Sequence, residues 1–124
     1  MKVAKITILG EERPLCFSTR VMCDATERFG GVGEMFGVMR EDNLKRKMDG
    51  IFWLLAALLK AGQAYAQLVG EPCPEPLSAE QLMDLYGVDD LAGLTAAVAE
   101  AVTAGTRRTV EAEPGKNSEA TPGE

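Results

Sequence analysis

Apolar and polar positions alternate along the first residues of the chain, as they do in a β-strand. Val3, Ile6 and Ile8 alternate imperfectly with polar residues, and residues 15–17 are a second short stretch of β-forming residues. Residues 10–14 lie between the two stretches and contain a glycine, a proline and three charged residues, which favour a turn. This pattern predicts an N-terminal β-hairpin with its turn at residues 10–14.

A short helix is predicted directly after the hairpin. Ser18 or Thr19 can cap its first turn, and the glycines at 30–31 can end it after Phe29. Its apolar residues share one side, which we expect to pack on the hairpin: Val21, Met22, Ala25 and Phe29.

The glycine-rich stretch 30–37 predicts a flexible connection. Met35, Phe36 and Met39, in and just after it, are apolar enough to form one turn of helix against the core. On a mobile segment the same three side chains could instead form a partner-binding surface, because methionine adapts to partners of different shape. No Lys followed by Ser or Thr comes after these glycines, so they do not form a phosphate-binding loop.

The longest periodic stretch predicts a helix of about 27 residues, roughly 40 Å long. Asp42 or Asn43 can cap it, and Gly70 and Pro72 end it. Its apolar residues recur at steps of three and four: Leu44, Met48, Ile51, Leu55, Leu58, Gly62, Tyr65 and Val69.

Two shorter helices are predicted after a loop that contains three prolines. Ser78 and Gln81 have the spacing of a capping box, in which the hydroxyl accepts a hydrogen bond from the backbone three residues on and the amide side chain reaches back. One of the aspartates at 89–90 can cap a last helix, which Gly105 is expected to end.

These elements predict an α+β fold that is mostly α. An N-terminal β-hairpin packs on a helical bundle with one long central helix and a C-terminal helical pair. A chain of 124 residues suits one domain, which we place at residues 1–105. From Thr106 on, the chain has no large apolar residue except Val110, so we expect residues 106–124 to be a disordered acidic tail.

Charge and composition exclude several functions. Thirteen Lys and Arg against nineteen Asp and Glu give a net charge of −6, which disfavours binding to nucleic acid. Because the chain has no histidine, it cannot form a Ser-His-Asp or Cys-His catalytic unit or an HExxH zinc site. We therefore expect a protein that is not an enzyme and that has no cofactor, no metal and no small-molecule substrate.

The cysteines and apolar runs indicate a cytoplasmic protein. Cys16, Cys23 and Cys73 fit neither a metal-binding motif nor a disulfide framework, and they suit free thiols in a reducing compartment. No apolar signal-peptide region follows the basic start of the chain. The longest apolar run, residues 51–59, would cover only ~14 Å of a hydrocarbon core of ~30 Å, so we expect no membrane partner.

Trp53 is the most informative residue of the long helix. It lies nearly opposite the apolar stripe, on a face that also carries Ala57 and Lys60. A small domain can bury one face of such a helix, but a tryptophan on the other face needs a different cover. One hypothesis is that this face meets another copy of the protein or a partner helix. The alternative is a bent or rotated helix that places Trp53 inside the monomer.

Residues 82–88 and the helix after them have the order of a helix-turn-helix motif. This makes a DNA-binding regulator an alternative function. The recognition helix would begin at residues 91–97, where Thr95 is the only hydrogen-bonding side chain and no Arg, Lys, Asn or Gln is available for base edges. The composition therefore favours a packing motif.

Four stretches carry a resemblance to a known family. They are residues 5–10 (KITILG), 15–20 (LCFSTR), 29–31 (FGG) and 53–62 (WLLAALLKAG). In these stretches and in the order of its elements, the chain resembles the tail assembly chaperones encoded by phages and prophages of bacteria. The resemblance covers about residues 1–105 and includes no catalytic signature.

The resemblance implies a small acidic helical protein of the bacterial host cytoplasm without enzymatic activity. Such proteins oligomerise and coat the long helical tape-measure protein until tail-tube subunits displace them. The expected partners are thus other copies of the chain and a tape-measure-like helix. The residues expected to bind them are Met35, Phe36, Met39, Trp53, Ala57 and Lys60. A small oligomeric scaffold or adaptor of other bacterial origin is a further alternative.

Overall fold

The computed structural model of the chain describes residues 3–112, with side chains up to residue 106. Strand β1 (Ala4–Ile8) pairs antiparallel with β2 (Glu11–Leu15), which confirms the predicted hairpin. Its turn is shorter than predicted, because residues 11–14 belong to the second strand. Only Leu9 and Gly10 connect the strands, with positive φ values of 53° and 81° that suit a two-residue turn of type I′.

Helix α1 (Thr19–Phe29) has the predicted ends. The Ser18 hydroxyl accepts a hydrogen bond from the Val21 amide, and Gly30 adopts the left-handed conformation that ends many helices. The stretch after it is more regular than a flexible connection. It forms the short helix α2 (Val32–Gly37) and the 3-10 helix η1 (Val38–Arg40), which lead into the next helix.

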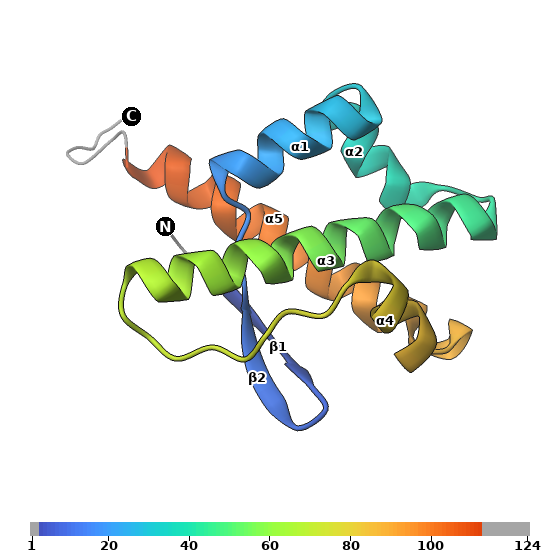
Figure 1. The fold of residues 1–124 in the computed structure, drawn as a ribbon. Coiled ribbons are helices and arrows are strands. Elements are labelled where there is room, and N and C mark those ends of the chain that lie inside the picture. Colours follow the sequence, from blue (N-terminus) through green and yellow to red (C-terminus); the bar gives the residue numbers. More distant parts are fainter. Residues whose placement is uncertain (1–2, 113–124) are drawn as a thin grey trace.

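The long central helix α3 (Leu44–Leu68) has 25 residues, and the side chain of Asn43 caps it. Figure 1 shows α3 running through the middle of the fold, with the hairpin on one side, α1 on the other and the C-terminal helix crossing behind. The predicted apolar stripe is buried in its middle, whereas Leu44 and Val69 at its two ends are exposed.

By length and composition alone, α3 is long and apolar enough to cross a membrane. The uninterrupted apolar run at residues 51–59 was too short to indicate this. Nine of its residues are buried by the other elements of the fold, and they include three large side chains outside the predicted stripe: Phe52, Leu54 and Leu59. The core of the protein therefore accounts for part of the apolar character of this helix, since 44% of its apolar window is buried.

Helix α4 (Ala79–Leu85) begins with the predicted capping box of Ser78 and Gln81. The 3-10 helix η2 (Val88–Asp90) leads into α5 (Leu91–Ala112). Gly105 does not end α5, contrary to the prediction. It is buried, and a Cβ atom there would lie 2.9 Å from the Cβ of Phe17, so its role is close packing. Residues 106–112, where the tail was expected to begin, continue α5, and residues 113–124 lie outside the described part of the chain.

Candidate functional site

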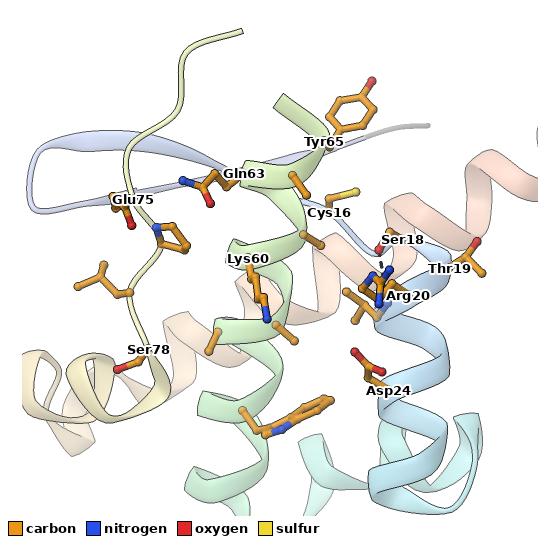
Figure 2. A pocket seen from close by; sticks show the side chains of 18 of the residues that line it. Cys16, Ser18, Thr19, Arg20, Asp24, Lys60, Gln63, Tyr65, Glu75 and Ser78 are labelled. Atoms are coloured by element: carbon orange, nitrogen blue, oxygen red, sulfur yellow. Dashed lines mark hydrogen bonds between the residues drawn. The ribbon is translucent and has the colours of Figure 1, made fainter. Parts of the chain in front are cut away.

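A groove of about 930 Å³ runs along one side of α3. Figure 2 shows it from close by, with α3 as its floor and α1 and the chain before α4 as its walls. The floor extends from Trp53 to Leu68, which is fifteen steps of 1.5 Å or ~22 Å along the helix axis. The groove is therefore long enough for about four helical turns of another chain.

The floor of the groove consists mainly of small apolar side chains. Four alanines of α3 line it together with Trp53, Tyr65 and Leu68: Ala56, Ala57, Ala61 and Ala64. Alanine side chains are short, so the backbone of α3 lies close to the open space and large side chains of a bound molecule have room there. This arrangement suits an apolar segment that carries its own large residues.

Charged side chains mark the middle and the walls of the groove. Lys60 stands on the floor between Asp24 of α1 and Ser78 at the start of α4, as Figure 2 shows, while Arg20 and Glu75 lie on opposite walls. Lys60 is exposed and forms no ion pair with any residue between 3 and 106. An acidic group on a bound molecule would find an available cation here.

Trp53 is partly covered by its own chain. Its ring meets the ring of Phe29 edge to face, with centroids 5.5 Å apart and planes at 88°. The Arg28 guanidinium lies 5.3 Å from the Trp53 ring centroid, within the range of a cation–π interaction. Both residues come from the end of α1. The tryptophan is therefore covered without a bend or rotation of α3, but it is only partly enclosed. The rest of its ring lines the groove.

Of the six residues predicted to bind partners, the groove brings together three, namely Trp53, Ala57 and Lys60. Met35 is only 1% exposed and belongs to the core, so it is not available on the surface. Phe36 and Met39 pack against the same core from α2 and η1 and do not line the groove. These three residues act as core residues because their segment is folded as helix.

The walls of the groove were not predicted. Arg20 and Asp24 on α1 face residues 75–78 across α3, and these segments are about fifty residues apart in sequence. Only their packing on a shared helix brings them together. The one local signal was the run of prolines at 72, 74 and 76, which indicated an extended segment but not what it would cover.

The site offers little for catalysis. Burial raises the pKa of the Cys16 thiol, which lowers the fraction of reactive thiolate at neutral pH. Among the side chains that the structure describes, residues 3–106, no cluster of three or more Cys, Asp or Glu is placed to hold a metal ion. The groove is equipped to hold an apolar molecule.

The proposed recognition helix at the start of α5 uses its polar side chain internally. The Thr95 hydroxyl donates to the carbonyl oxygen of Leu91 at 2.8 Å, and both Leu91 and Leu94 are buried. The exposed positions of these first turns, Ala92, Gly93 and Ala96, have no polar side chain to offer a base edge. This face of α5 does not favour DNA recognition.

Comparisons with protein-family models, with curated proteins and with solved structures found no match. Function is therefore inferred from the groove and from the resemblance in the sequence.

Proposed function

We propose that this protein is a non-enzymatic binding protein whose groove holds an amphipathic helix of another protein. The single observation that carries the proposal is the open apolar groove along α3, with Trp53 at one end and a floor of alanines. In line with the resemblance to phage tail assembly chaperones, we propose a tape-measure-like helical protein as the partner.

The dimensions and lining of the groove support a helix as the bound element. A helix with its side chains is about 10–12 Å wide, and helix-in-groove recognition uses apolar anchors spaced at three and four residues. The alanines leave room for such anchors, and Trp53 supplies the kind of aromatic contact that dominates many interfaces. The unpaired ammonium of Lys60 favours a helix with an acidic residue near the middle of its apolar face.

Two observations favour a different protein over a second copy of this chain as the occupant. Each copy has a net charge of −6, so copies repel one another at low ionic strength. The large apolar side chains in the described part of α5 are also buried in the core, as are most of those of α3 outside the groove floor. A homo-oligomer, which the resemblance also implies, is a separate prediction.

Co-expression tests this proposal. If a long coiled-coil-rich reading frame lies next to the gene, its product should gain soluble yield when this chain is co-expressed. Ala57→Glu, which places a bulky anion on the groove floor, should abolish the gain. The matched control is Ala96→Glu, which adds the same charge at an exposed position of α5 outside the groove.

Absence of any gain, or an equal gain with Ala57→Glu, would contradict the proposal. Light scattering of the purified protein gives the third outcome. If the chain alone forms oligomers that Ala57→Glu dissociates and Ala96→Glu does not, the groove is occupied by a second copy.

A further inference from the structure

One wall of the groove has little backbone support. We name residues 71–77, which join α3 to α4, the strap. The Glu71 amide donates to the carbonyl oxygen of Ala66 at 2.8 Å, and just after the strap the Ser78 amide donates to the Gln81 side chain at 2.9 Å. Between these two anchors, residues 72–77 donate no hydrogen bond within the described part of the chain, and three of them are prolines without an amide hydrogen.

Arg13 provides the hydrogen bond that holds the middle of the strap. Its guanidinium Nη1 donates to the carbonyl oxygen of Glu75, 62 residues away in sequence. Glu75, Pro76 and Leu77 are also the strap residues that line the groove. A side chain of the hairpin therefore sets the position of a groove wall.

The Arg13 guanidinium is buried but only partly satisfied. The residue is 6% exposed, and Nη2 donates to Glu11 Oε1 at 3.2 Å, although the Glu11 side chain is itself 58% exposed. Its Nε has no hydrogen-bond partner among the described residues. A buried cation with an unsatisfied donor is costly, and moving the strap away would let water reach it. The unsatisfied Nε therefore offsets part of the stabilisation that the hydrogen bond to Glu75 contributes while the strap covers Arg13.

From this arrangement we infer that the strap is a movable wall of the groove and that Arg13 is its latch. In the closed position the guanidinium holds the Glu75 carbonyl. When the hydrogen bond between Arg13 and Glu75 breaks, the strap moves away from the hairpin while its two ends stay anchored, and the groove widens beside Lys60. Arg13 and the backbone amides of the non-proline strap residues then become hydrated. The inference concerns the groove itself and holds whether or not the proposed partner is correct.

The three cysteines of the chain report on this motion without any added label. Cys23 on α1 is exposed and gives the reactivity of an unprotected thiol. Cys16 borders the groove on the side of α1, away from the strap, and is 0% exposed, so we expect it to react only when the packing of β2 and α1 on α3 opens. Cys73 lies in the strap and is partly buried. Iodoacetamide alkylation, followed at each cysteine by mass spectrometry, therefore separates opening of the strap from unfolding of the protein.

Arg13→Met keeps much of the buried volume and removes the donors. We expect it to raise the alkylation rate of Cys73 severalfold, toward that of Cys23, while Cys16 stays unreactive. The matched control, Glu11→Gln, removes a charge beside the guanidinium but keeps the Glu75 contact, and we expect all three rates to stay unchanged. An unchanged Cys73 rate in Arg13→Met would overturn the inference. A parallel rise at Cys73 and Cys16 would also overturn it, because Arg13 would then support the whole fold.

A second measurement uses the unmodified protein, so it does not require that Arg13→Met folds. Below the unfolding transition, alkylation through a local opening depends weakly on urea, whereas alkylation through global unfolding depends steeply on it. We expect a weak dependence for Cys73 and a steep one for Cys16. The same steep dependence at both cysteines would show that the strap opens only with the core.

Discussion

The carbonyl oxygen of Pro14 occupies the place that a Cβ atom on Gly62 would need. Two residues further along the hairpin, the Cys16 amide donates to the carbonyl oxygen of Leu58, one turn before Gly62, at 3.2 Å. The end of β2 thus lies directly on the backbone of α3. This contact fixes the hairpin, and with it Arg13, relative to the floor of the groove.

Gly62→Ala should lower the free energy of unfolding by ~1–3 kcal/mol or more, as overpacking of a core usually does. The neighbouring atom is backbone, which cannot rotate away as a flexible side chain would. The measurement is the free energy of unfolding from urea titration. Gly93→Ala is the matched control, because a Cβ atom on this exposed helical glycine has no neighbour within 4 Å. There we expect a gain of up to ~1 kcal/mol from helix propensity. Equal losses at both sites would contradict the packing of β2 on α3.

The capping box at Ser78 is a second site with a defined contribution. The Ser78 hydroxyl accepts from the Gln81 amide at 3.1 Å and the Gln81 side chain accepts in return from the Ser78 amide. Ser78→Ala should therefore cost ~1 kcal/mol of stability, measured by thermal unfolding. At Ser18 the corresponding bond to Val21 is 3.4 Å long and is not reciprocated, so Ser18→Ala should cost less. A larger loss at Ser18 would be the opposite of this expectation.

Features that depend on residues close in sequence could be predicted from the sequence. Ser18, Asn43 and Ser78 each cap a helix by accepting a hydrogen bond from an amide three residues on, so a short pattern contains all that is needed. The apolar period of α3 likewise predicts a long helix. These local signals were enough for the order and type of the main elements.

Features that depend on distant residues could not be predicted. Gly105 follows an apolar pattern as a helix-ending glycine does, and only its contact with Phe17, 88 residues earlier, shows that it lies inside a helix. The cover of Trp53 comes from Arg28 and Phe29, which sequence periodicity cannot relate to it. The walls of the groove depend in the same way on where α1 and the strap pack, which explains why only its floor was predicted.

Fluorescence can test the cover of Trp53, because it is the only tryptophan of the chain. Phe29→Ala removes the edge-to-face contact, so we expect red-shifted emission and stronger quenching by acrylamide. Phe36→Ala is the matched control. It also removes a partly buried aromatic ring from the core, but its residue does not line the groove, so we expect the emission to stay unchanged in the folded protein. Equal spectra of Phe29→Ala and the unmodified protein would show that α1 does not cover the indole in solution.

The same fluorescence reports on occupation of the groove. A helix bound on the floor would shield the remaining exposed part of Trp53, so emission should shift to the blue and acrylamide quenching should fall in the co-purified complex. Lys60→Glu should weaken the complex if the bound helix carries an acidic residue beside it, as the unpaired ammonium suggests. A complex that forms without any change in tryptophan emission would place the partner on another surface.

Alkaline pH should destabilise the fold through two groups. Burial raises the pKa of the Cys16 thiol above its ordinary value of 9.0. Burial and the negative charge of Asp90 raise the pKa of Tyr86 above 10.0, although the positive charge of Arg13 acts in the opposite direction. Each group therefore holds its proton more tightly in the folded than in the unfolded state. Well below pH 9 both states are protonated and stability does not depend on these groups.

As the pH rises through 9 for Cys16 and through 10 for Tyr86, the unfolded state loses protons first. The free energy of unfolding should then fall until the folded-state pKa values are passed. Tyr86→Phe should reduce the part of this fall above pH 10, as measured by urea unfolding at successive pH values. In a Tyr65→Phe background, Arg13→Met should raise the pKa of Tyr86 further, since it removes the charge that lowers it, and absorbance at the tyrosinate band follows that titration. A lower pKa of Tyr86 in Arg13→Met would mean that the guanidinium acts on this phenol mainly by keeping water out.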